Sequence, residues 1–116
     1  MKRKHSIKKT SEIDAVFKIK KSVGNPYFVI YKKKDNGYDY FRYALSIGKK
    51  YGKAHERNLI KRRIRMIVSE TASTIDLKTD FIIVIKPKAS ELEYNQIKVN
   101  ILALMSKAQI TSQERN

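Results

Sequence analysis

The chain of 116 residues is long enough for one domain with a single core, and a 41% hydrophobic content argues against wholesale disorder. It has no cysteine, which excludes disulfides, thiol catalysis and cysteine-bound metals, and no apolar run approaches the roughly 20 residues that span a bilayer. With 26 Lys and Arg against 11 Asp and Glu, the net charge of +15 predicts a polyanionic partner. We expect one soluble, cytoplasmic domain, residues 1–116.

Two other interpretations explain the charge less well. A surface charged for solubility usually carries a net charge of about 2–8. An anionic membrane would require an amphipathic helix with a lipid-facing stripe, whereas the helices expected here use their apolar faces for a core. Nucleic acid is therefore the favoured partner, and no membrane is expected.

The chain begins with a basic segment and then a helix. Residues 1–9 hold five Lys or Arg and almost nothing to bury, so we expect a mobile basic arm. Residues 11–20 predict a helix, which Ser11 can cap with Asp14 at the capping-box position. Its apolar face would be formed by Ile13, Val16 and Phe17.

Three segments predict strands. Residues 27–33 are β-branched and aromatic, and residues 35–37, Asp-Asn-Gly, form a turn after which residues 40–48 return as a second strand. The nearly continuous apolar run at residues 80–86 is typical of a central strand covered on both faces, and Pro87 ends it.

Two further helices complete the pattern. The second is expected at residues 54–71, and the third at residues 91–108, with a capping box formed by Ser90 and Glu93. The third helix would bury Tyr94, Ile97, Ile101, Leu104 and Met105. Residues 109–116 are polar and are expected to fray. The order α-β-β-α-β-α predicts a single α-β sandwich with one sheet, which we assign to the α+β class.

The expected second helix carries a basic stripe beside an apolar one. At about 100° per residue, the polar side chains of the stripe fall within an arc of roughly 140°. They are Arg57, Asn58, Lys61, Arg62 and Arg65. The apolar stripe, about 120° away, consists of Ile60, Ile64, Ile67 and Val68. Like charges four residues apart destabilise a helix by a few tenths of a kcal/mol, and bound phosphates would relieve that repulsion.

A solvated helix face is the alternative, but such a face usually alternates the signs of its charges. Residues 49–65 instead hold eight Lys or Arg and one acid, Glu56. Arginine forks can bridge two phosphate oxygens, and Asn58 can contact a 2′-hydroxyl or a base edge. The candidate RNA-binding residues are therefore Lys49, Lys50, Lys53, Arg57, Asn58, Lys61, Arg62 and Arg65.

These residues resemble the signature of the bacterial ribonuclease P protein family. The signature is matched by Ser46-Ile47-Gly48-Lys49-Lys50, Gly52, Ala54, Arg57-Asn58, Lys61-Arg62 and Arg65. Flanking positions match in the same order at Lys8-Lys9, Phe17, Ser22-Val23, Asn25, Phe28-Val29, Tyr31, Arg42, Asp80, residues 82–85 and Ala89. The resemblance extends from Lys8 to about Met105, which is nearly the whole chain.

The resemblance implies a ribosomal S5 domain 2-like fold with a left-handed crossover through the second helix, against the roughly 98% right-handed rule. It implies that the basic helix binds ribonuclease P RNA. A separate cleft between the first helix and the sheet would hold the single-stranded 5′ leader of precursor tRNA. The cleft residues it indicates are Ile13, Phe17, Tyr31 and Lys86. The RNA would carry the Mg²⁺-dependent cleavage, and no obligate protein partner is expected.

The chain departs from the family pattern at three positions. Ile13 stands where many relatives have an aromatic residue, so this position offers no ring on which a base could stack. Lys53 replaces a frequent Asn and His55 a small apolar residue, and both changes add possible phosphate contacts. From the residues alone, Phe17 is a core candidate, and the resemblance is what places it in the cleft.

The chain offers no evident catalytic site of its own. Its carboxylates are scattered, and His5 and His55 lie among cations without a carboxylate beside them, so no catalytic residue or metal ligand is expected. One alternative from charge alone is a basic ribosomal or nucleoid protein without enzymatic role. Another is a stand-alone nuclease, which the missing acidic cluster disfavours.

Overall fold

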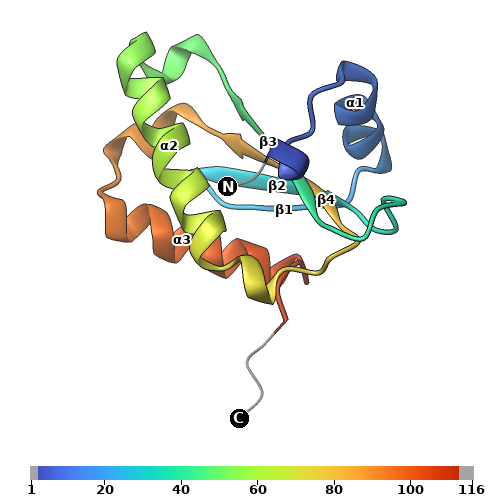
Figure 1. Cartoon of the computed structure of the whole chain (residues 1–116). Helices are drawn as coiled ribbons and strands as arrows, with labels where there is room; N and C mark the ends of the chain where they lie inside the picture. Colours follow the sequence, from blue (N-terminus) through green and yellow to red (C-terminus); the bar gives the residue numbers. More distant parts are fainter. Residues whose placement is uncertain (1–2, 113–116) are drawn as a thin grey trace.

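A computed structural model describes residues 3–112 as one four-stranded sheet in the order β1-β2-β4-β3, with α2 and α3 on one face and α1 on the other (Figure 1). The helices and strands are α1 Thr10–Ile19, β1 Ser22–Gly24, β2 Phe28–Lys33, β3 Arg42–Ile47, α2 Ala54–Glu70, β4 Asp80–Ile85 and α3 Tyr94–Lys107. Short 3-10 turns lie at Arg3–His5, Lys49–Tyr51, Ala72–Thr74 and Pro87–Glu91. The expected α+β sandwich is confirmed, with β1 as an additional short strand.

Strand β4 lies between the two strands that precede it in the chain. It pairs antiparallel with β2 and parallel with β3, and the parallel pair is joined through α2. The predicted turn after β2 does form, with Asp35 and Gly37 in the left-handed region at φ 57° and 84°. Its Asn36 side chain donates to Asp80 at the start of β4 over 2.9 Å. The turn therefore leads the chain past the start of β4 to the outer edge, where β3 forms.

The main core fills the space between the sheet and the α2–α3 layer. Side chains alternate along β4, so that Phe81 and Ile83 enter this core while Ile82 faces α1 together with Val16. All three residues of β4 named here are fully buried, which confirms the prediction of a strand covered on both faces. The predicted apolar stripe of α2 is confirmed as well, since Ile60, Ile64, Ile67 and Val68 are buried.

The predicted caps of two helices are wrong. Helix α1 begins at Thr10 with Lys9 at its N-cap, and no side chain caps it, so Ser11 does not have that role. Helix α3 begins at Tyr94, after the 3-10 turn that contains the buried Ala89, and Gln96 accepts a 2.8 Å bond from the Glu93 backbone N–H. Burial of Ala89 keeps the preceding turn against the core, which delays the start of the helix.

Both ends of the described chain pack more closely than expected. An arm with almost nothing to bury is the wrong description of residues 3–9, because Ile7 is buried and its N–H donates to the Tyr43 carbonyl over 3.0 Å. Residues 109–112 also pack, since Ile110 is fully buried and its carbonyl accepts from the Asp76 N–H at 2.8 Å. The remainder of both predicted segments, residues 1–2 and 113–116, lies outside the described residues. Within residues 3–112, no helix combines the length and apolarity that a membrane crossing requires.

Candidate nucleic-acid interface

The basic stripe of α2 points away from the core because the helix commits its opposite stripe to the sheet. Asn58, Arg62 and Arg65 are exposed, and Lys61 is half-buried. Arg57 is half-buried too, with Nη1 donating to the Gly52 carbonyl over 2.6 Å. The predicted residues of the helix therefore form one continuous polar surface.

The single acid of this segment is engaged at the start of the helix. The Glu56 carboxylate accepts the Lys53 backbone N–H at 2.8 Å, which satisfies a donor that the helix itself leaves free. A Cβ on Gly52 would lie 2.8 Å from the same carboxylate oxygen, so that a larger residue there would displace it. Lys49 and Lys50 are exposed on the adjoining 3-10 turn. The carboxylate of Glu56 is thus already hydrogen-bonded to the backbone, and the cations of the interface greatly outnumber it.

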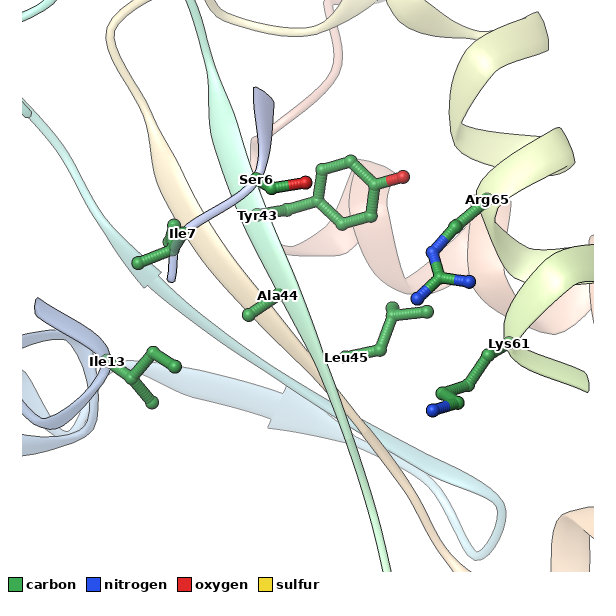
Figure 2. Close-up of a pocket in the computed structure, with 8 residues that line it drawn as sticks. All are labelled: Ser6, Ile7, Ile13, Tyr43, Ala44, Leu45, Lys61 and Arg65. Atoms are coloured by element: carbon green, nitrogen blue, oxygen red, sulfur yellow. The ribbon is translucent and has the colours of Figure 1, made fainter. Parts of the chain in front are cut away.

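A pocket of about 480 Å³ connects this surface with the opposite face of the sheet (Figure 2). Ile13 of α1 and Ala44 of β3 line one side, and Lys61 and Arg65 of α2 line the other. Strand β3 is the outermost strand of the sheet, and Ser6 and Ile7 lie along its outer edge, so that the pocket extends around this edge beside them. The basic stripe of α2 and the expected leader cleft, which the resemblance describes as separate, therefore adjoin each other at this edge, through Ile13 of the cleft.

The other expected cleft residues lie on the α1 face of the sheet. Phe17 and Tyr31 are both half-buried and meet edge to face, with ring centroids 4.8 Å apart. Val16, which is fully buried, fills the core position of α1. By strand alternation, the half-buried Lys86 follows β4 on the same face, beyond Val84. The structure thus brings Phe17 and Tyr31 into contact, while Ile13 lies in the β3-edge pocket and Lys86 at the far end of the face.

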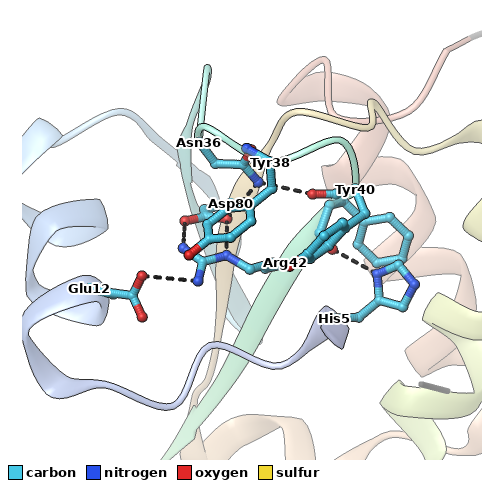
Figure 3. A network of polar contacts seen from close by, with 8 residues as sticks. His5, Glu12, Asn36, Tyr38, Tyr40, Arg42 and Asp80 are labelled. Atoms are coloured by element: carbon cyan, nitrogen blue, oxygen red, sulfur yellow. Dashed lines mark hydrogen bonds and ion pairs between the residues drawn. The ribbon is translucent and has the colours of Figure 1, made fainter. Parts of the chain in front are cut away.

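A buried ion pair fixes α1 above this face (Figure 3). Arg42 donates two hydrogen bonds to Asp80, at 3.0 and 2.7 Å, and a third to Glu12 of α1 at 3.0 Å. Arg42 is 8% exposed and Asp80 is 1% exposed. Hydrogen bonding of the Arg42 guanidinium to the Asp80 carboxylate, which accepts, is the main cause of the raised pKa of Arg42. The guanidinium also lies 4.3 Å from the centre of the Tyr38 ring.

The sequence gives only a weak signal for this network. Arg42 and Asp80 match family positions, but their pairing requires that β3 and β4 be neighbours, which the chain order does not reveal. His5 packs within the structure. Its ring stacks on Phe41 with centroids 4.1 Å apart, and Nδ1 lies 2.7 Å from the Phe41 carbonyl oxygen, to which it can donate as N–H. His55 is exposed at the start of α2.

Sequence and structure comparisons identify close relatives. The family model for Ribonuclease P matches residues 1–109. The chain is 53% identical over 107 residues to the ribonuclease P protein component of Phytoplasma australiense, and the aligned segment covers 92% of this chain and 93% of that protein. It is 51% identical over 114 residues to that of Acholeplasma laidlawii, with 98% and 97% covered. The solved Staphylococcus aureus RNase P protein aligns with a TM-score of 0.87 at 31% identity, covering 93% of this chain and 98% of that one.

Proposed function

The chain belongs to the ribonuclease P protein family, and on this basis we propose that it binds ribonuclease P RNA and the 5′ leader of precursor tRNA. The observation that carries the proposal is the basic stripe of α2, with its adjoining loop. Lys49, Lys50 and Lys53 continue the stripe toward β3, and Glu56, the one acid nearby, is bonded at the helix start. Phosphate groups would supply the counter-charge that this surface lacks.

The protein's contribution is positional and electrostatic. Cations on α2 would bind backbone phosphates of the catalytic RNA and reduce the repulsion between RNA segments. Phe17 and Tyr31 would stack on leader bases, an interaction that tolerates any base because every base has an aromatic face. Precursor tRNA would then bind more tightly than mature tRNA, because only the precursor has a leader to occupy the cleft.

Mg²⁺ is the cofactor that we propose for the RNA subunit. Within residues 3–112, no three His, Cys, Asp or Glu side chains gather into a group that could hold a metal ion. The buried carboxylate of Asp80 is engaged by Arg42 and Asn36. We propose that the RNA holds the Mg²⁺ and carries out the metal-dependent cleavage.

Reconstitution tests the proposal directly. Mixed with a ribonuclease P RNA and precursor tRNA at low Mg²⁺, the protein should restore cleavage at the mature 5′ end, because it neutralises phosphates that Mg²⁺ would otherwise screen. Gel analysis of the cleaved 5′ leader provides the measurement. The protein alone should leave the precursor intact. Cleavage by RNA-free protein, abolished by one Asp or Glu substitution, would contradict the assignment of catalysis to the RNA.

The same assay separates this function from that of a basic ribosomal or nucleoid protein. Such a protein would bind RNA through charge without restoring cleavage at the mature 5′ end. Failure to stimulate the RNA, together with equal binding to unrelated RNAs, would favour that alternative.

Removing one cation of the stripe should weaken the complex with ribonuclease P RNA. Arg65→Ala is expected to lower the slope of log K against log salt by about one, if the contact is to phosphate. Arg63→Ala is the matched control, because Arg63 lies on the side of α2 beside Tyr51 and Leu92, away from Arg65. Filter binding at several salt concentrations measures both slopes. Equal slope changes in the two variants would show that the stripe has no special role.

A further inference from the structure

A second basic cluster lies at the β1 edge of the sheet, opposite the edge formed by β3. Four lysines line a pocket of about 280 Å³ there, together with the first residues of β1 and the end of α3. They are Lys20, Lys21, Lys32 and Lys107, which we call the lysine pocket. They come from the segment after α1, from β2 and from α3, so that the tertiary structure brings them together. Neither the basic stripe of α2 nor the cleft includes them.

The positive charge of the lysine pocket exceeds what its surroundings neutralise. No Asp or Glu lines the pocket, and none of its lysines forms a salt bridge within residues 3–112. Lysines are common at helix C-termini, and α1 and α3 both end here. Each helix end supplies only about −0.5 charge, which leaves about three positive charges among four ammonium groups. Helix ends therefore do not account for the cluster.

Lys32 is held in place within the pocket. Its Nζ donates to the Ala108 carbonyl at the end of α3, and an ammonium group has two further hydrogens to donate. Burial lowers the pKa of Lys32, as do the charges of Lys34 and Lys21, while Asp76 raises it. A bound anion would raise the pKa of Lys32, as Asp76 does, and so stabilise its charged form. The site thus combines an oriented donor with unsatisfied positive charge, as a phosphate group requires.

The lysine pocket adjoins the end of the proposed leader cleft. Ser22 of β1 lies directly opposite Tyr31 of β2 in the sheet register. Lys20 and Lys21 directly follow α1, which carries Phe17. A strand stacked on Phe17 and Tyr31 and leaving the cleft past β1 would therefore reach these lysines next.

We propose that the lysine pocket binds phosphodiester groups of the precursor tRNA leader beyond the nucleotides that occupy the cleft. This proposal rests on the leader-binding function proposed above. It assigns a length-dependent part of leader binding to lysines at the β1 edge. The first nucleotides of the leader depend on the aromatic pair, and the more distal ones depend on charge.

Three of the four pocket lysines are exposed, and substitution of two of them, one after α1 and one at the end of α3, tests this. Lys21→Gln combined with Lys107→Gln removes two charges and keeps Lys32 on its carbonyl. Lys78→Gln combined with Lys98→Gln is the matched control, since neither residue lines the pocket or the cleft. Each holoenzyme is titrated with precursors whose leaders are lengthened one nucleotide at a time, and with mature tRNA. Thermal melts by circular dichroism show that both variants fold as the parent does.

With short leaders, the pocket variant should bind like the parent protein. With long leaders, it should bind roughly two- to twentyfold more weakly, because two exposed charge contacts are lost. The slope of log K against log salt should become smaller in magnitude by about 1.4, because each lost contact to a single-strand phosphate contributes about 0.7. The control variant should keep the length dependence of the parent.

Two results would overturn the proposal and are distinguishable from each other. If the parent prefers precursor to mature tRNA but the pocket variant keeps the full gain from longer leaders, the lysine pocket does not bind leader. Weaker assembly with ribonuclease P RNA in that same variant would assign the pocket to the catalytic RNA. If the parent shows no preference for precursor over mature tRNA, the leader-binding function itself fails, and this inference fails with it.

Discussion

Asp80→Ala is expected to lower the free energy of unfolding by about 3–5 kcal/mol. The substitution removes the carboxylate that accepts two hydrogen bonds from Arg42 and leaves that guanidinium buried with Glu12 as its remaining acidic partner. It also removes one of the two acceptors of the Asn36 side-chain amide, which holds the turn before β3, and leaves the Tyr40 carbonyl as the other. Because arginine stays protonated, the lost partner cannot be offset by deprotonation. Urea unfolding followed by circular dichroism measures the change.

Two controls isolate the cause. Glu12→Gln keeps the Arg42–Asp80 pair and changes a side chain that is 31% exposed, so it should cost less than about 1 kcal/mol. The double variant Arg42→Met with Asp80→Leu removes both charges and should be more stable than Asp80→Ala, since no buried charge is left unpaired. A loss below about 1 kcal/mol for Asp80→Ala would contradict a stabilising role for the pair.

Phe17→Ala and Tyr31→Ala are each expected to reduce holoenzyme affinity for precursor tRNA by about 1–3 kcal/mol, one lost base stack apiece. Mature tRNA has no leader and should bind as before. Assembly with ribonuclease P RNA should also be retained, since Phe17 belongs to α1, which lies on the opposite face of the sheet from α2 (Figure 1), and Tyr31 packs against Phe17. Equilibrium binding of the two tRNAs to each reconstituted holoenzyme gives the comparison.

Val16→Ala is the matched control for the cleft. Val16 precedes Phe17 on α1 and is fully buried, so its truncation should lower stability without changing the preference for precursor over mature tRNA. Phe17 is half-buried, and Phe17→Ala should cost less stability than the roughly 3–5 kcal/mol of a core phenylalanine. Equal losses of affinity for both tRNAs in folded Phe17→Ala would contradict a leader-binding role.

Local patterns determined the parts of the candidate site that belong to one helix. The basic stripe of α2 and its apolar partner follow from the helical period alone, and the structure confirms the buried stripe from Ile60 to Val68. The central position of β4 can also be predicted from the sequence, since a strand that is apolar on both faces must be covered on both. These features depend on neighbours within a few residues of each other, which any local pattern records.

Only the tertiary structure decided which distant residues meet. The chain order does not reveal that β4 separates β2 from β3, and that arrangement is what pairs Arg42 with Asp80. Residues 3–9 are too short and polar to predict packing, yet the free edge of β3 provides a partner for the Ile7 N–H. The lysine pocket likewise gathers residues from three separate segments. Such contacts depend on strand pairing between distant segments, whose free energy is set by the whole core rather than by any local pattern.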